Sequence, residues 1–334
     1  MSNSWRALAK MARDRIVASD PEDLGRILDL WSLRLSSLAR LRLTNQASAE
    51  CTNLFAVLNA VHATSIPGMH ELVHPFELTM FHARVHYWSG DPLGYVDALS
   101  RILRRCKERA REEGRIGPDD VLAAAEANLS MWLERIARAC LILASQMIEM
   151  NDYQAAINLL TPLCTNRAAP AFQPTPTPEL HSALARVYLL SGNLQKAEEH
   201  FSIAVSAAAN SANGTDVIAM NTALLAAASG DWTRAEEALS EMVAKDPGNF
   251  TAINNLAVTL LYQGRIKEGI DLLEAALKMS PSSVVVTEPF LFNLSTLYEL
   301  RSTAAIDKKR GLLIEVAKWS GDGLKTSCLK MPAS

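Results

Sequence analysis

Small and large apolar residues recur in a fixed order through the C-terminal two-thirds of the chain. Within residues 178–211, a large apolar residue, Leu184, is followed by a small one, Ala185. The turn pair Gly192-Asn193 comes next, and then a small and a large residue, Ala197 and Phe201. Gly230 and Gly264 lie 34 residues apart. Pro247 and Pro281 keep the same separation. Apolar spacings of three and four predict helices, and the turn residues between them predict repeated pairs of antiparallel helices.

A period of this length, with small residues at fixed places and a closing proline, is typical of the tetratricopeptide repeat. One such helix pair is too small to bury its own apolar face, so successive pairs stack into a continuous core with a long concave surface. We therefore predict an all-α fold, a right-handed superhelical solenoid of tetratricopeptide repeats with irregular N-terminal helix pairs. The function typical of this architecture is the binding of other proteins.

The residue types at the fixed places have physical reasons. Ala185 and Ala197 fall where the two helices of a pair are predicted to cross, and only a small side chain lets the backbones approach. The Gly192-Asn193 turn suits a left-handed backbone, which costs little only for glycine or asparagine. Asn151 takes the place of this glycine in the preceding unit.

The period divides the chain into two regions. Residues 1–136 are predicted to form an irregular N-terminal region of helices and degenerate repeats. Residues 137–334 are predicted to form a continuous single solenoid, with repeats at 137–170, 178–211, 216–249, 250–283 and 288–321. The alternating prolines of residues 169–178 predict an extended, exposed linker. Val284, Val285 and Val286 form the only β-like run, which is too short for a sheet.

Composition narrows the class of protein further. The formal net charge of −3 says little about partners, and 49% hydrophobic residues with 6% aromatic residues suit a helical core of Leu and Ala. No apolar run reaches the roughly 18–20 residues that a membrane-spanning helix requires, and the first residues lack the apolar core of a signal peptide. The five cysteines are scattered without CxxC spacing, as expected for reduced thiols in the cytosol.

A row of asparagines is the sharpest hypothesis for a binding site. Asn221, Asn255 and Asn293 occupy the same place in three successive repeats, two residues before the paired small residue. Asn254 sits beside this row. The place is expected to face the concave groove, where a carboxamide pairs with the backbone of an extended peptide. The alternative is that each asparagine only satisfies a neighbouring helix.

A basic run extends from Arg101 to Arg115 and is a second candidate surface. An acidic protein, a phosphoinositide or nucleic acid would be attracted to such a run. The candidate partner-binding residues are Arg101, Arg104, Arg105 and Arg109. The competing interpretation is a solvated helix with internal Arg–Glu pairs. No interleaved aromatic residues support nucleic-acid binding, so only protein partners are expected.

Histidines are the only residues that suggest an enzyme or a metalloprotein. His82 and His86 stand one helical turn apart. His70 and His74 show the same spacing nearby, which leaves a four-histidine metal site as an open alternative. His82 and His86 lack the glutamate of zinc peptidases and take packing positions in the repeat alignment. Because phosphate loops, Gly-x-Ser-x-Gly elbows and kinase signatures are absent, we expect a non-catalytic protein without a cofactor.

Three longer strings do not belong to the generic repeat consensus. They are FELTMFHARV at 76–85, YWSGDPLGY at 87–95 and FLFNLSTLYEL at 290–300. Together they resemble the C-terminal repeat region of the family of trafficking protein particle complex subunit 12, also called tetratricopeptide repeat protein 15. The resemblance covers essentially the whole chain.

This resemblance implies a scaffold role in a multisubunit vesicle-tethering complex. The assembly acts as a guanine-nucleotide exchange factor for a Rab-type small GTPase, in transport from the endoplasmic reticulum to the Golgi and in autophagy. The exchange chemistry resides in other subunits, so no catalytic residue is carried over to this chain. The implied location is cytoplasmic, at the endoplasmic reticulum–Golgi intermediate compartment or the Golgi, with membrane association through the complex. A nuclear, mitotic role at kinetochores is also implied.

The sequence leaves three functional hypotheses. The first is a scaffold that docks other subunits through its groove or its end. The second is a peptide-binding adaptor that captures short motifs, and the third is an enzyme or metalloprotein. Capture of a C-terminal carboxylate would need Lys or Arg beside the asparagines. The residues that flank them are uncharged: Met220, Thr222, Asn254, Leu256, Phe292 and Leu294.

Overall fold

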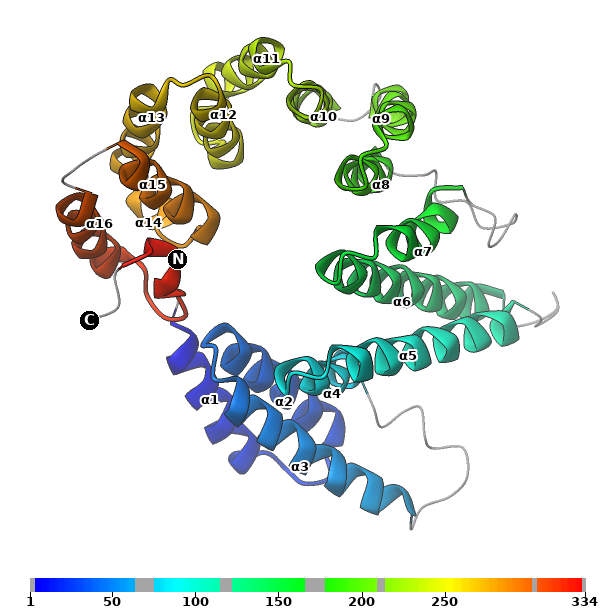
Figure 1. Ribbon diagram of the computed structural model, residues 1–334. Helices are drawn as coiled ribbons and strands as arrows, with labels where there is room; N and C mark the ends of the chain where they lie inside the picture. Colours follow the sequence, from blue (N-terminus) through cyan, green and yellow to red (C-terminus); the bar gives the residue numbers. More distant parts are fainter. Residues whose placement is uncertain are drawn as a thin grey trace. The chain divides into compact units, whose positions relative to one another are not determined.

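The chain folds entirely into helices over the part that the structure describes. The computed structural model describes residues 4–63, 75–114, 122–165, 178–208, 214–301 and 305–331. These ranges form sixteen α-helices and one short 3₁₀ helix, η2, and contain no strand (Figure 1). The predicted all-α fold is therefore confirmed. Residues 169–177 of the predicted linker, and His70 and His74, lie outside the described residues.

The helices form two compact units, and the boundary between the units falls within α7. The N-terminal unit is Ser4–Leu160 and the C-terminal unit is Thr161–Ser334. The first seven helices are α1 Trp5–Ala18, α2 Leu24–Arg40, α3 Thr44–Ala63, α4 Phe76–Trp88, α5 Pro92–Glu113, α6 Leu122–Glu149 and α7 Tyr153–Thr165. Residues 137–165 of the first predicted repeat thus correspond to the end of α6 and to α7.

Helix starts in the N-terminal unit follow from short polar side chains. The Asp23 carboxylate accepts a hydrogen bond from the Arg26 amide at the start of α2. The Asp91 carboxylate accepts one from the Gly94 amide at 2.8 Å, and Pro92 follows at the first position of α5. Both arrangements satisfy amide groups that a helix N-terminus leaves without a carbonyl partner.

A buried ion pair joins three helices of the N-terminal unit. Arg34 on α2 is 8% exposed, and its guanidinium donates to the Ala9 carbonyl of α1 at 2.9 Å. The same guanidinium pairs with the Glu50 carboxylate of α3 at 2.5 Å. Around it, Leu28, Leu35 and Cys51 form part of an apolar core. Pairing of this kind lets a charge be buried beside apolar residues.

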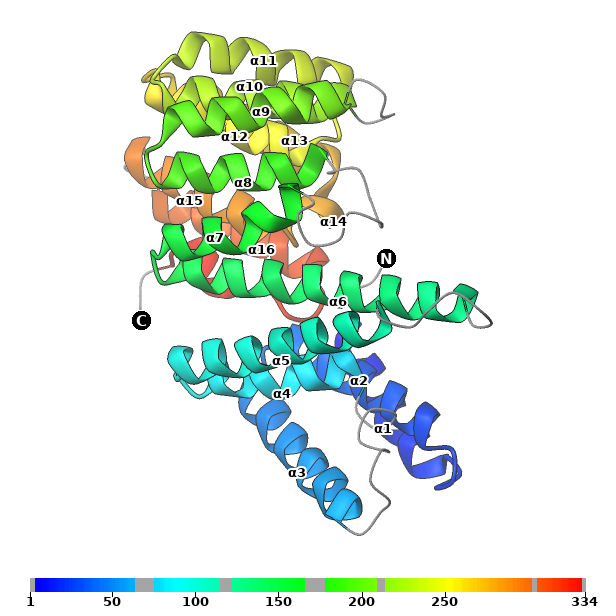
Figure 2. The ribbon, with the colours of Figure 1, turned by 90° about the vertical axis from the view of Figure 1, so that its right-hand side faces the viewer.

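The C-terminal unit stacks four helix pairs. Its remaining helices are α8 Pro178–Leu190, α9 Leu194–Ala208, α10 Gly214–Ala228, α11 Trp232–Lys245, α12 Phe250–Tyr262, α13 Ile266–Met279, α14 Pro281–Val284, α15 Glu288–Arg301, α16 Ala305–Trp319 and η2 Thr326–Leu329. Helices α8, α10, α12 and α15 lie on one side of the stack, and their partners α9, α11, α13 and α16 lie on the other (Figure 1). Figure 2 shows α8 to α11 lying side by side along the stack.

Small residues stand where paired helices approach, as predicted. Ala185 and Ala197 are both 0% exposed and share a core with Phe201. The backbones of α12 and α13 also approach each other closely. A Cβ atom on Gly269 of α13 would lie 3.2 Å from the Ala257 carbonyl oxygen of α12, so glycine allows these two backbones to meet.

The turns between paired helices adopt left-handed backbone conformations. The φ angles are 79° at Gly192, 79° at Gly230 and 80° at Gly264. Asn151 occupies the equivalent turn between α6 and α7 with a φ of 62°. The turns predicted from the glycine and asparagine positions are therefore confirmed.

The valine run forms no strand. Pro281–Val284 is the short helix α14, which accounts for the longer step between the repeats that begin at 250 and 288. Val284 and Val285 are both 0% exposed and lie in the core formed with Phe290 and Leu291. Burial, rather than strand propensity, explains the β-branched side chains at these positions.

All five cysteines are buried, and none of them forms a disulfide bond. Burial raises the pKa of the Cys51 thiol to about 12 and that of Cys164 to about 11. It also raises the pKa of the Cys106 and Cys140 thiols. Among the described residues, no helix is both long enough and apolar enough to cross a membrane.

Candidate functional site

The asparagine row divides into a buried member and partly exposed members. Asn221 is 1% exposed, and its side-chain amide donates to the Ser182 hydroxyl of α8 at 2.8 Å. The Asn221 carbonyl oxygen is buried without a hydrogen-bond partner among the described residues. Asn221 therefore joins α10 to α8, and a ligand would reach it only after local rearrangement.

The other asparagines keep part of their surface in solvent. The Asn255 amide makes only a weak contact with the Met220 sulfur, at 3.4 Å. The Asn293 amide donates to the Asn254 carbonyl oxygen of the preceding repeat at 3.0 Å. Asn254, Asn255 and Asn293 therefore remain the candidates for a peptide contact in the row.

A shallow apolar cavity of about 310 Å³ lies beside Asn255. Three first helices of successive pairs line it with Arg186, Leu189, Leu190, Met220, Leu224 and Thr251. Arg186 has no acidic partner among the described residues, and partial desolvation lowers the pKa of its guanidinium. A cation at this site was not predicted from the sequence, because the residues next to the asparagines in sequence are uncharged. Arg186 comes from α8, two helix pairs earlier, and only the stacking of repeats brings it to Asn255.

The predicted basic surface lies on one helix. Arg101, Arg104, Arg105 and Arg109 line a depression of about 430 Å³ on α5, together with Glu108 and Glu112. The Arg109 guanidinium pairs with the Glu112 carboxylate at 2.8 Å. An internal Arg–Glu pair is thus present, while Arg101 and Arg104 remain exposed. The use of this surface by a partner stays a prediction.

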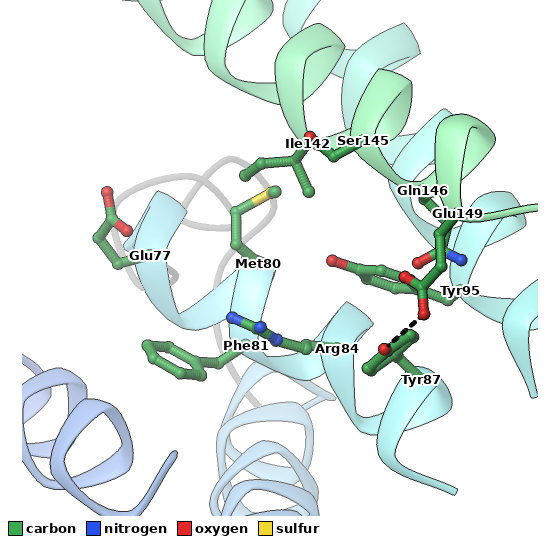
Figure 3. Close-up of a pocket in the computed structure, with 10 residues that line it drawn as sticks. All are labelled: Glu77, Met80, Phe81, Arg84, Tyr87, Tyr95, Ile142, Ser145, Gln146 and Glu149. Atoms are coloured by element: carbon green, nitrogen blue, oxygen red, sulfur yellow. Dashed lines mark hydrogen bonds between the residues drawn. The ribbon is translucent and has the colours of Figure 1, made fainter. Parts of the chain in front are cut away.

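A cavity in the N-terminal unit was not predicted from the sequence. It has a volume of about 360 Å³ and lies between α4, α5 and α6 (Figure 3). Met80, Phe81 and Ile142 form its apolar wall, and Arg84, Tyr95 and Gln146 contribute polar groups. The residues come from three consecutive helices but are spread between positions 77 and 149, so no linear motif marked the site.

Two carboxylates border this cavity, and each has a partner. The Tyr87 hydroxyl donates to Glu149 at 2.8 Å, and this hydrogen bond raises the pKa of Tyr87. The Arg138 guanidinium lies 2.7 Å from the Glu77 carboxylate. The acidic groups at the rim are therefore engaged by neighbouring donors.

Three polar groups of the cavity are less well satisfied. Gln146 is 5% exposed and Tyr95 is 6% exposed, and neither side chain has a hydrogen-bond partner among the described residues. Burial raises the pKa of the Tyr95 hydroxyl, which keeps it protonated as a donor. Arg84 lies over the Trp88 ring at 5.8 Å and has no carboxylate partner within the described ranges. One feature of the sequence could have indicated this site: Gln146 is a polar residue on the apolar helix face that contains the buried Leu143 and Met147.

The histidines predicted as an alternative metal site occupy packing and surface positions. The His82 ring stacks on Phe55 with centroids 4.1 Å apart, and burial lowers the pKa of His82. The Nδ1 atom of His86 lies 3.4 Å from the Asp91 carboxylate. Within the described ranges, no group of three or more His, Cys, Asp or Glu side chains is placed to hold a metal ion.

The fold and these surfaces define a class of protein. The tetratricopeptide repeat family matches residues 226–285, which include α11 and the pair α12 and α13. A solved tetratricopeptide repeat protein from Parabacteroides merdae is 14% identical, aligns over 76% of this chain and 96% of its own, and gives a TM-score of 0.43. The repeated helix pairs of the structure and the family match over residues 226–285 define a helical-repeat fold of the tetratricopeptide class.

Within that class the chain is a homologue of trafficking protein particle complex subunit 12. It is 30% identical to the Mus musculus protein over 318 residues, which cover 91% of this chain and 39% of the mouse protein. It is 29% identical to the Homo sapiens protein over 318 residues, which cover 91% of this chain and 42% of the human protein. The chain therefore spans about two-fifths of the length of these relatives.

Proposed function

We propose that this chain is a non-catalytic scaffold region of a vesicle-tethering complex, in which it docks other subunits. The observation that carries the proposal is the 30% identity over 318 residues to a protein whose name places it in a multisubunit complex. The stacked helix pairs support the proposal because such stacks present extended surfaces for contact. We also propose that this scaffold consists of an irregular helical region, 1–136, followed by regular repeats, 137–334.

The finer functions in this proposal belong to the whole assembly. They are nucleotide exchange on a Rab-type small GTPase, transport from the endoplasmic reticulum to the Golgi, and autophagy. We assign none of that chemistry to residues of this chain. The proposed location is cytoplasmic, at the intermediate compartment or the Golgi, with attachment to the membrane through the complex. A mitotic role at kinetochores is kept as a second role of the same scaffold.

Purification of the tagged chain from its own cells, followed by crosslinking mass spectrometry, tests this function. We expect other subunits of the tethering complex to co-purify and to crosslink to the chain. An unrelated tetratricopeptide repeat protein with the same tag controls for non-specific capture. A folded chain that purifies without any tethering subunit would overturn the scaffold proposal.

A peptide-binding adaptor is the second candidate, and the cavity beside Asn255 favours it. Arg186 and Asn255 supply a cation and a carboxamide at an apolar depression, which is the combination that an extended peptide with an acidic group would contact. The double substitution Asn255→Ala and Asn293→Ala is expected to weaken partner capture without changing the melting temperature. Asn221→Ala is the matched control for an asparagine with a structural role. It should lower the stability of the fold, because loss of a buried hydrogen bond costs about 1–3 kcal/mol. Unchanged capture with an unchanged fold would remove this candidate.

A further inference from the structure

The basic surface of α5 continues onto α6, where a second depression adjoins it. We propose that an extended, acidic segment of a protein partner docks along this surface, with its carboxylates on the arginines. This inference rests on the proposed function only in that the chain acts through protein contact. The second depression has a volume of about 180 Å³, and Arg101 and Arg105 line both it and the depression on α5.

Charge complementarity is the first argument, because the second depression carries only positive charge. Arg101 and Arg105 of α5 and Arg135 of α6 line it, and none of its lining residues is acidic. Glu77, the acidic residue of α4, pairs with Arg138 at 2.7 Å. The two depressions together are lined by five arginines and two glutamates, whereas the whole chain has a formal net charge of −3. A carboxylate is attracted to such a surface, and a guanidinium group binds it through two parallel hydrogen bonds.

Aromatic contacts hold Arg135 in place beside α5. Its guanidinium lies over the Trp132 ring at 4.7 Å and over the Phe76 ring at 5.5 Å. Helices α5 and α6 pack against each other (Figure 2). Burial raises the pKa of the Cys106 thiol between them, and the charges of Arg135 and Arg105 oppose this rise, so both arginines lie near the same thiol. A cation that is already positioned loses less freedom when a partner binds.

The spacing of the arginines is the second argument, and it indicates an extended segment. Arg101 and Arg105 are four residues apart in α5, so they lie on one face of the helix, about 6 Å apart along its axis. Alternate residues of an extended chain project to the same side and are about 6–7 Å apart. Two carboxylates at alternate positions of a segment that runs along α5 therefore match the two arginines.

The other lining residues favour a protein segment over a nucleic acid or a membrane surface. Phe76, Ile102 and Trp132 add apolar side chains to the second depression. Glu108 and Glu112 stand among the arginines of α5. They repel a uniformly anionic surface, but they accept hydrogen bonds from the amide groups of a peptide. A segment with both acidic and apolar residues fits this combination, as in other acidic motifs that arginine clusters recognise.

Fluorescence anisotropy with synthetic peptides tests the inference on the whole chain. The probes are capped, labelled peptides of Gly and Ser that contain one Leu and two Asp residues at alternate positions. One matched set replaces Asp by Asn, one replaces Asp by Lys, and one has the same composition with the two Asp residues adjacent. We expect the alternating Asp peptide to bind about tenfold more tightly than the Asn peptide, a factor that corresponds to about 1.4 kcal/mol. The peptide with adjacent Asp residues should bind with intermediate affinity.

Variants of the chain identify where the peptide binds. The double substitution Arg101→Gln and Arg105→Gln should remove the discrimination between Asp and Asn peptides. The charge reversal Arg101→Glu and Arg105→Glu should shift the preference to the Lys peptide. Arg135→Lys should bind the Asp peptide more tightly than Arg135→Gln, because lysine keeps the charge. Arg234→Gln, at an exposed position of α11, is the matched control and should leave all affinities unchanged.

Three results would each overturn the inference. The first is equal binding of Asp and Asn peptides, or of alternating and adjacent Asp residues. The second is equal binding of the Asp peptide to the native chain and to a double glutamine variant whose melting temperature is unchanged. The third is tighter binding of phosphatidylserine-containing vesicles or of a single-stranded DNA oligonucleotide than of the Asp peptide, with Arg101 and Arg105 required.

Failure of this inference is separate from failure of the scaffold proposal. Tethering subunits that co-purify with the native chain, in the absence of peptide discrimination, remove the arginine surface alone. Peptide discrimination without co-purifying subunits removes the scaffold proposal alone.

Discussion

Backbone conformation at single residues decides what several turn positions tolerate. Gly264 has a φ of 80°, which an L-residue with a side chain adopts only at a cost. Gly311 lies inside the helix α16 and has no such angle. An added Cβ atom would meet nothing within 4 Å at either position, so steric room does not distinguish them.

The two glycines should therefore respond to alanine with opposite signs. Gly264→Ala is expected to cost about 1–2 kcal/mol because the left-handed conformation disfavours a Cβ atom. Gly311→Ala is expected to gain up to about 1 kcal/mol, because alanine loses less backbone entropy in a helix. Urea unfolding monitored by circular dichroism measures both values. Equal effects of the same sign would show that the φ angle at Gly264 does not control the turn.

Sequence patterns located the special turn residues but not the orphaned polar groups. Glycine or asparagine at a fixed place identifies a left-handed turn, because few other residues adopt it. Whether Asn221 faces a groove or a neighbouring helix depends on the angle between α10 and α8, which no local pattern specifies. Its bond to Ser182 therefore became visible only in three dimensions, as did the open amide of Gln146.

The helix pair α8 and α9 contains two histidines in direct contact. The Nδ1 atoms of His181 and His200 lie 3.1 Å apart, and the His200 ring also stacks on Tyr188 with centroids 5.4 Å apart. Burial lowers the pKa of His181 below its usual value of 6.5. Burial and the neighbouring His181 also lower the pKa of His200; Lys196 lowers it slightly further, and Glu199 partly opposes these effects.

Acid should weaken this pair of helices. Since the histidine pKa values are lower in the folded chain, the unfolded chain binds more protons just below pH 6.5, and stability rises with pH there. The contribution is complete above pH 6.5 and is lost as the pH falls toward the folded pKa values. We expect the urea midpoint of the native chain to fall between pH 7.5 and 5.5. The double variant His181→Gln and His200→Gln should show a smaller fall, and His82→Gln serves as the single-histidine control. The same pH dependence in native chain and double variant would contradict this account.

Helix pairs were predictable because apolar spacing and turn residues agree over each repeat. The exception is α14, since a short run of valines between two repeats gives no periodicity to interpret. The burial of α14 against Phe290 and Leu291 determines the structure of this segment. Such a contact between elements cannot be read from the local sequence. The long spacing between the repeats that begin at 250 and 288 showed where extra residues lie, but not that they form a helix.

On the scale of the whole chain, the two compact units have separate apolar cores. Leu35 belongs to a core of the N-terminal unit and is 0% exposed. Leu184 in the C-terminal unit is also 0% exposed. In a stack of repeats each pair depends on its neighbours, so a local loss spreads along the stack rather than across the molecule.

Core truncations should therefore affect the unit in which they lie. Leu35→Ala and Leu184→Ala are each expected to cost about 2–5 kcal/mol. Hydrogen exchange measured by mass spectrometry should increase in α1 to α4 for Leu35→Ala, and in α8 to α11 for Leu184→Ala. Leu190→Ala, at a residue 56% exposed on α8, is the control and should change little. Equal increases throughout the chain in both variants would show a single cooperative unit instead.

The candidate cavity shows which information the sequence lacks. Its polar groups come from α4, α5 and α6, and their convergence depends on how these helices pack. In the C-terminal unit, by contrast, the recurring sequence pattern of the repeats predicts how neighbouring helices pack. The N-terminal helices follow no such pattern, so their side chains could be assigned to helices but not to a shared site.

The buried thiols have a practical consequence for labelling. The thiolate is the reactive form of cysteine, and burial with a raised pKa suppresses it. Cys51 and Cys164, with pKa values of about 12 and 11, should react slowly with maleimides at neutral pH. A new cysteine on an exposed helix face would then carry a fluorophore selectively, and spectroscopic probes could be attached without first removing the native sulfur atoms.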